Sequence, residues 1–229
     1  MRDAGPGGRV KGYVPAVRLL YLHGFASGPG SKKGVAFAEH FAARGIDVAR
    51  LNLRVPSFEH LRLSAMIDHV QAAIGEPRER AVIVGSSLGG LTAARVAERD
   101  ARVGALILFA PAFQLVDRWR TVLADDFAAW QRTGWREVVD YTTGQSARVD
   151  FGFVEDARQV DIGFPDVRVP TLVIHGVHDD VVPIDHARRF AAGKRHVRVI
   201  EVDDGHELVA SLPRLLAEAD AFLAPWLGA

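Results

Sequence analysis

A serine flanked by glycines is the first feature of this sequence that could do chemistry. Residues 85–89 are Gly-Ser-Ser-Leu-Gly, with Ser87 at the centre of a G-x-S-x-G pattern. An apolar run at 81–85 precedes the pattern and an alanine-rich segment at 88–99 follows it, which predicts a sharp turn from a strand into a helix. A residue at the tip of such a turn has a strained backbone, and the flanking glycines relieve the crowding. The nearby helix N-terminus favours negative charge. We interpret Ser87 as a candidate nucleophile; the alternative is a glycine- and serine-rich turn without chemistry.

A serine hydroxyl is a weak nucleophile and needs a general base. The sequence has nine histidines, and His206 is the best placed of them. It follows the apolar run at 197–202 and precedes the last predicted helix, so we expect it on a loop at the same sheet edge as Ser87. Packing or surface roles are expected for the histidines within or near helices or at strand starts, which are His40, His60, His69, His186 and His196.

The base in turn needs an acid that fixes its tautomer and stabilises the imidazolium. Asp179 and Asp180 both lie in the loop that follows the apolar run at 171–175. The order serine, aspartate, histidine along the chain is the one that accompanies a serine on a strand-to-helix turn. On the residues alone, either aspartate can serve.

A loop that could stabilise a developing oxyanion follows the first apolar run, at 18–23. Residues 23–28 are His-Gly-Phe-Ala-Ser-Gly. The backbone N–H of Phe25 can donate to an oxyanion, with a second donor from Leu88 directly after the nucleophile. Loss of one such donor typically costs about 2.7–4 kcal/mol of transition-state stabilisation. We expect His23 to support this loop and not to transfer protons.

The elements that must position these residues alternate between strands and helices. We expect strands at 18–23, 46–53, 81–85, 104–109, 171–175 and 197–202, and helices at 31–44, 58–74, 88–99, 184–192 and 208–223. Such alternation predicts an α/β fold, with a mostly parallel central sheet that helices cover on both faces.

Residues 112–170 interrupt this alternation, because they hold no clear strand. We expect an inserted, mainly helical cap here, above the edge where ligand clefts of open α/β sheets form. The cap is rich in aromatic residues, namely Phe113, Trp119, Phe127, Trp130, Trp135, Phe151 and Phe153. These side chains either line an apolar substrate pocket or pack the cap onto the core, and packing is expected for most of them.

The motifs together resemble the α/β-hydrolase superfamily, from about residue 18 to the C-terminus. YLHGF, GSSLGG, IHGVHDDVVP and DDGHEL resemble, in this order, the oxyanion loop, nucleophile elbow, acid loop and histidine loop of that superfamily. The acid motif HG-x-x-D-x-x-V-P selects Asp179 over Asp180. The stretch YLHGFASGPGSKK also resembles small bacterial esterases of the YqiA-like group.

The resemblance implies an α/β-hydrolase domain over residues 17–229, with a cap at about 112–170. Residues 1–16 are rich in glycine and show no clear periodicity, so we expect a flexible arm that holds at most a short strand near 10–14. One or both of the superfamily's first two strands are expected to be absent, because little chain precedes YLHGF.

The reaction it implies is hydrolysis of a carboxylic ester or thioester through a Ser87–His206–Asp179 triad and an acyl-enzyme, as in a carboxylesterase. Phe25 and Leu88 N–H groups would hold the oxyanion, and no metal or organic cofactor is required. Thioesterase, peptidase, lactonase and C–C hydrolase activities share these motifs. Dehalogenase and epoxide hydrolase activities are disfavoured, since they call for a carboxylate at position 87. A catalytically silent fold member that binds a small molecule or a partner is the alternative of a different class.

Composition limits the partners. The formal net charge is zero, which gives no general attraction to nucleic acid or anionic lipid. The chain has no cysteine, which excludes disulfides and thiolate chemistry. No uncharged apolar stretch reaches the ~18 residues of a membrane span, and the first residues lack the apolar core of a signal peptide. We expect a cytoplasmic protein that acts on a small acyl substrate, and the sequence does not predict an oligomeric state.

Overall fold

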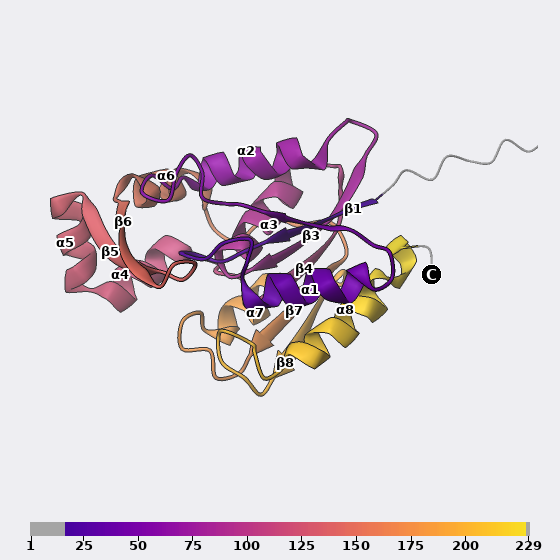
Figure 1. Ribbon diagram of the computed structural model, residues 1–229. Helices are drawn as coiled ribbons and strands as arrows, with labels where there is room; N and C mark the ends of the chain where they lie inside the picture. Colours follow the sequence, from indigo (N-terminus) through magenta and orange to yellow (C-terminus); the bar gives the residue numbers. More distant parts are fainter. Residues whose placement is uncertain (1–16, 228–229) are drawn as a thin grey trace, which may run out of the picture.

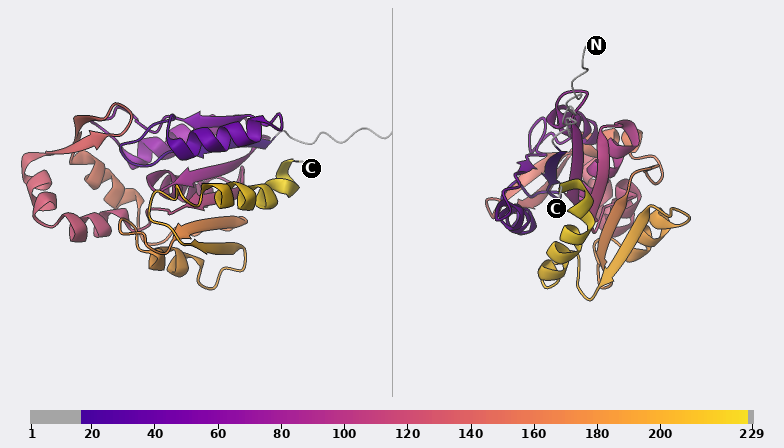
Figure 2. Two further views of the ribbon diagram at one scale, coloured as in Figure 1. Left: turned by 60° about the horizontal axis from the view of Figure 1, so that its bottom comes forward. Right: turned by 90° about the vertical axis from the view of Figure 1, so that its right-hand side faces the viewer.

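Six apolar runs form one parallel sheet in the computed structural model, which describes residues 17–227 (Figure 1, Figure 2). The strand order is β2-β1-β3-β4-β7-β8. The strands are β1 (Val17–Leu22), β2 (Val48–Leu51), β3 (Arg80–Ser86), β4 (Val103–Phe109), β7 (Thr171–Gly176) and β8 (Val197–Val202). This confirms the predicted parallel sheet. Within the described residues no strand precedes β1, while the flexible arm and the short strand expected at 1–16 lie outside them.

Helices cover both faces of this sheet, as the alternating elements predict. Two of them, α1 (Lys32–Ala42) and α8 (Leu212–Leu227), pack on one face. The helices on the other face are α2 (Leu63–Ile74), α3 (Leu88–Arg99) and α7 (Ile184–Ala191). Between residues 17 and 227, no helix combines the length and the apolar character needed to cross a membrane.

The central strands are apolar on both faces because both faces are buried. In β1, Leu20 and Leu22 belong to the core under α2 and α3, whereas Leu19 and Tyr21 belong to the core under α1 and α8. The same period of two continues in β3 and β4. Since all strands are parallel, their carboxyl ends meet at one edge, and the loops that carry the candidate site leave from that edge.

The segment between β4 and β7 holds a hairpin that its sequence does not predict, in addition to the expected helices. Its helices are α4 (Leu115–Leu123), α5 (Asp125–Thr133) and α6 (Gly152–Val160), and its antiparallel strands are β5 (Trp135–Asp140) and β6 (Gln145–Asp150). The expectation that residues 112–170 contain no strand is wrong in this respect. Most residues of both strands are exposed or half-buried, so no alternation of apolar and polar residues marks them. Figure 1 shows this segment, called the cap below, beyond the edge to which the strands point.

A buried ion pair fastens the cap to α3. The side chains of Arg95 on α3 and Asp161 at the end of α6 are 3% and 2% exposed. The Arg95 Nη2 donates to Asp161 Oδ1 at 2.8 Å, and the other Asp161 oxygen accepts from the Leu115 N–H at the start of α4, at 3.3 Å. Asp161 therefore joins both ends of the cap to the helix that begins at the candidate nucleophile.

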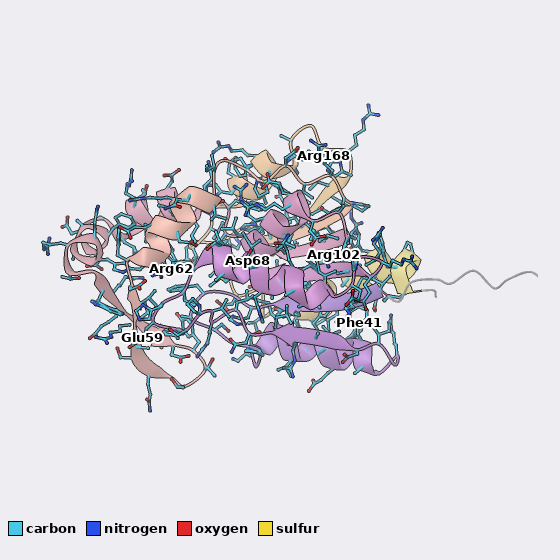
Figure 3. The ribbon with its side chains drawn as sticks, turned by 90° about the horizontal axis from the view of Figure 1, so that it is seen from above. Phe41, Glu59, Arg62, Asp68, Arg102 and Arg168 are labelled. Carbon is cyan, nitrogen blue, oxygen red and sulfur yellow. The ribbon has the colours of Figure 1, made fainter. Side chains whose placement is uncertain are left out.

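We predict that Asp161→Ala lowers the free energy of unfolding by about 3 kcal/mol, because it removes the buried carboxylate that pairs with the Arg95 guanidinium and leaves it with the partly exposed Glu98 and the backbone carbonyls of Ile162 and Gly163. Urea denaturation measures this change. Arg168→Ala is the matched control, since the Arg168–Asp166 pair is 85% and 61% exposed. Figure 3 shows Arg168 extending from the surface. Its loss should cost less than about 1 kcal/mol. Equal losses in the two variants would contradict a special role for the buried pair.

Candidate active site

Ser87 lies on a strained turn between β3 and α3, as its sequence context predicts. Its φ of 53° is in the left-handed region, which a non-glycine residue adopts only when its surroundings enforce it. The surroundings leave no room for a side chain at position 85 or at position 89. A Cβ on Gly85 would lie 2.3 Å from the Gly89 carbonyl oxygen, and one on Gly89 would lie 2.3 Å from the Leu22 carbonyl oxygen. Both glycines are therefore required for the backbone to turn so tightly.

The structure brings the predicted base and acid to this serine. His206 Nε2 lies 3.0 Å from Ser87 Oγ, and His206 Nδ1 lies 2.8 Å from Asp179 Oδ2. Asp180 forms no hydrogen bond or ion pair with His206, so the geometry agrees with the choice of Asp179. The side chain of Asp179 is fully buried, while that of His206 is 12% exposed. A proton can therefore pass from the serine to an imidazole whose other nitrogen is held by a carboxylate.

Asp179 is held in its ionised form by a ring of donors. Burial alone would raise its pKa, but hydrogen bonds from His175 and His206 outweigh it and bring the pKa of Asp179 well below its usual range. Its Oδ1 accepts from the backbone N–H groups of Val181 and Val182, at 2.9 and 2.7 Å. The carboxylate is thus a fixed negative charge beside the imidazole.

His175 contacts the carboxylate of Asp179, a role that the sequence analysis did not assign to it. Its Nε2 lies 3.0 Å from Asp179 Oδ2 and 2.9 Å from the Val182 carbonyl oxygen. A carbonyl can only accept, so the proton of this fully buried ring is on Nε2. The signal in the sequence is a histidine at the end of β7, four residues before the acid.

The histidine loop, residues 203–211, is fixed from both ends. Asp204 accepts from the N–H groups of Gly205 and Ser211, each at 2.8 Å. Leu208 is fully buried with a φ of 53°. A Cβ on Gly176 would lie 2.3 Å from the Asp204 carbonyl oxygen, so the end of β7 and this loop touch through their backbones. The loop enters α8 only at Leu212, because these contacts hold residues 208–211 outside the helix.

The oxyanion loop, residues 23–28, lies against the nucleophile. A Cβ on Gly24 would lie 3.4 Å from Ser87 Cβ. The N–H of Leu88 is at the first turn of α3 and has no acceptor within the helix. Among residues 17–227, the Phe25 N–H also forms no hydrogen bond, so both predicted oxyanion donors are unoccupied.

His23 supports this loop, as expected. Its Nε2 accepts from the Leu53 N–H at 3.0 Å, so its Nδ1 carries the proton and donates to the Gly24 carbonyl oxygen at 2.9 Å. Burial, together with the nearby charge of Arg54, lowers the pKa of His23. His23 is therefore a neutral structural histidine that shapes the backbone of the oxyanion loop.

Aromatic side chains of the cap pack against Phe25 of the oxyanion loop. The Phe25 ring centroid lies 5.0 Å from that of Trp119 and 6.0 Å from that of Phe153. Beside them is a cavity of about 10 Å³, lined by the oxyanion loop, Phe58, Met66 and Leu88 among others. A larger cavity of about 570 Å³ includes none of the predicted site residues.

Most of the aromatic residues expected in the cap do pack onto the core. Phe113, Phe127, Trp130, Phe151 and Phe153 are all buried. Trp119 is half-buried and contacts Phe25, so it is the cap aromatic best placed to meet a substrate.

The hairpin also contacts the oxyanion loop, through residues that the sequence analysis did not assign. The Arg54 guanidinium donates to both carboxylate oxygens of Asp140, at 3.0 and 2.5 Å, and to the Ser27 carbonyl oxygen at 2.8 Å. The N–H of Tyr141 donates to the Ala26 carbonyl oxygen at 2.9 Å. The tip of the hairpin thereby fixes the backbone of the loop that carries one oxyanion donor.

Two further contacts hold the base of the cap. Arg62, before α2, pairs with Asp150 of the hairpin at 2.7 Å, and Arg148 pairs with Glu59 at 3.0 Å. Figure 3 shows Arg62 and Glu59 on the side of the molecule that faces the cap. On the opposite wall, Arg118 of α4 donates to the carbonyl oxygen of Val181, next to the acid, at 3.0 Å.

Comparisons with known proteins identify a family that covers most of the chain. The profile of the Uncharacterised protein family (UPF0227) matches residues 18–224. No curated protein shows a significant sequence match.

Similar solved structures confirm the predicted α/β-hydrolase fold. Alpha/beta hydrolase domain-containing protein 10 from mouse has a TM-score of 0.75 and 21% identity, over 95% of this chain and 92% of its own. A putative hydrolase from Agrobacterium vitis S4 has a TM-score of 0.78 and 22% identity, over 90% and 88%. Est1E from Butyrivibrio proteoclasticus, with ferulic acid bound, has a TM-score of 0.76 and 18% identity, over 94% and 90%.

The lowered pKa of Asp179 predicts a pH-dependent contribution to stability. Its folded-state pKa lies below the ordinary value of 3.8, so the ionised carboxylate stabilises the fold above that value and loses this effect as the pH falls through the folded-state value. Asp179→Asn should therefore be more destabilising, relative to the native chain, at about pH 7 than at about pH 3. Unfolding free energies from urea denaturation at the two pH values test this. The same difference at both would contradict the prediction.

Proposed function

The chain belongs to the Uncharacterised protein family (UPF0227), and from this family membership and the geometry of its site we propose that it is a serine hydrolase that cleaves carboxylic esters. The observation that carries the proposal is the continuous hydrogen-bonded chain from Ser87 Oγ through the imidazole of His206 to Asp179, at 3.0 and 2.8 Å. The tight turn places the Ser87 hydroxyl at the end of this hydrogen-bonded series, and no acceptor among residues 17–227 binds the N–H groups of Phe25 and Leu88. It is the arrangement that acyl transfer to water requires.

In the first half of the reaction, Ser87 Oγ attacks the acyl carbon while its proton moves to His206 Nε2. The negative charge that develops on the carbonyl oxygen is held by the N–H groups of Phe25 and Leu88. The imidazolium is stabilised by Asp179, which stays ionised. The tetrahedral intermediate then collapses, and His206 donates its proton to the departing alcohol.

In the second half, water attacks the acyl-enzyme, and His206 takes the proton of the water. The new tetrahedral intermediate breaks down with release of the carboxylic acid, and Ser87 recovers its proton. No step calls for a metal or organic cofactor. The same steps would cleave a thioester, with a thiol as the leaving group.

The surroundings of Phe25 support a substrate with an apolar acyl group. The rings of Trp119 and Phe153 pack against that of Phe25, so apolar surface adjoins the oxyanion loop. Esterase activity also fits the similarity of this fold to Est1E with ferulic acid bound and to LipS and LipT, two metagenome-derived lipolytic enzymes.

We expect Ser87→Ala to lower kcat/KM for p-nitrophenyl acetate by roughly ten-thousandfold or more, because it removes the nucleophile of the triad. Ser146→Ala, at an exposed serine of the hairpin, is the matched control and should leave the rate unchanged. A fluorophosphonate probe should label the native chain and not the Ser87→Ala variant. If the native chain neither reacts with the probe nor cleaves the ester, the proposal fails, and a silent binding protein becomes the better interpretation.

Trp119→Ala should shift the preference toward longer acyl chains, because it removes a ring packed on Phe25. We expect the ratio of kcat/KM for p-nitrophenyl octanoate to that for the acetate to rise about tenfold, the scale that a few methylenes contribute in an apolar pocket. Trp135→Ala is the control, since Trp135 contacts His60 and Arg148 at the base of the hairpin. Equal shifts in both variants would count against Trp119 as a wall of the acyl site.

A further inference from the structure

Lys33 has its ammonium group against the histidine loop. Its side chain is only 11% exposed, and its Nζ donates to the backbone carbonyl oxygen of Glu207 at 2.6 Å. Glu207 directly follows His206. Lys33 itself belongs to the first turn of α1, the helix that begins shortly after the oxyanion loop. One side chain therefore links the helix behind the oxyanion loop to the residue next to the candidate base.

This contact is unlike a surface ion pair. The Glu207 carboxylate lies farther away, at 3.8 Å, and its side chain is 81% exposed. The close partner is the main chain of the loop, and the ammonium is largely removed from water. Burial of an ammonium is costly unless hydrogen bonds and nearby carboxylates offset the loss of its hydration. Burial lowers the pKa of Lys33, and the nearby carboxylates of Glu207, Asp179 and Asp204 partly offset this effect.

The other contacts of the histidine loop fix its ends and not its centre, where Lys33 binds. Asp204 binds the N–H groups of Gly205 and Ser211, and so fixes the two ends of the loop. Leu208 fixes the following turn by its burial. The Glu207 carbonyl lies between these points, so the bond from Lys33 sets the backbone orientation next to the imidazole.

We propose that Lys33 is a positioning residue for His206: its ammonium holds the Glu207 carbonyl so that the imidazole stays on Ser87. The catalytic consequence rests on the proposed hydrolase function. Lys33 does not touch the reacting atoms in this proposal, and it acts through the loop. The charged groups near its ammonium are the carboxylates of Glu207, Asp179 and Asp204.

Removal of the amine should slow the chemical step while substrate binding is kept. Lys33→Met should lower kcat about 10- to 100-fold with little change in KM, because a small displacement of a catalytic group is costly while the substrate contacts remain. Lys33→Arg keeps both charge and hydrogen-bond donor, and it should restore most of the native kcat.

The test measures, in the full chain, the kinetics of p-nitrophenyl acetate hydrolysis and the NMR signal of the His206 ring proton that faces Asp179. Lys32→Met is the matched control, since Lys32 is the adjacent lysine of the same turn but is exposed. Lys33→Gln also removes the ammonium, and it replaces Lys33→Met if circular dichroism shows that Lys33→Met does not fold. The proposal is overturned if the neutral variant that folds has the same His206 signal and the same kcat as the Lys32→Met control.

The two measurements distinguish failure of the proposed function from failure of the Lys33 role. If the native chain does not cleave esters, the proposed function fails, yet the His206 ring signal still shows whether Lys33 positions the imidazole. If the native chain is active and the ring signal and kcat of the Lys33 variants are unchanged, the role of Lys33 fails while the function stands.

Discussion

The carboxylate of Asp179 carries a negative charge where water does not reach, and the arrangement of the surrounding loops follows from keeping that charge satisfied. Two backbone N–H groups, His175 and His206 all point at it. A buried carboxylate with one donor missing would take up a proton or disrupt the fold. The acid loop must therefore turn back on itself after β7, and this turn sets the position of the imidazole that faces Ser87.

Close backbone contacts hold the imidazole in its position facing Ser87. Gly89 lies against the end of β1, and Gly176 lies against the histidine loop. Backbone atoms at van der Waals contact cannot shift as long side chains can, so the loops from several strand ends are held at fixed distances from one another. This rigidity is what a reaction with several aligned atoms requires. Lys33, Asp204 and Leu208 add side-chain anchors to the one loop that must carry a flexible imidazole.

The sequence predicts the site residues that lie in loops directly after an apolar strand. Ser87, Asp179 and His206 each follow an apolar strand, and parallel strands bring their carboxyl ends to one edge, so their proximity follows from the fold class. The contacts of Lys33, Arg54 and His175 do not follow in this way, because they depend on where long or buried side chains point. The sequence does not predict the hairpin, because its two strands lack an apolar face. Likewise, α2 begins at Leu63 and not at 58, since residues before it bind the cap.

The cap is bound to both walls of the site, because its hairpin tip holds the oxyanion loop while Arg118 of α4 holds the acid loop. A segment fixed at both sides is not an independent module. Natural or engineered changes in the cap that alter which substrates enter will also disturb the machinery that processes them. Selectivity and turnover are thus expected to evolve together in this family, and exchange of whole caps between relatives should succeed only when the residues at both attachment points are exchanged with them.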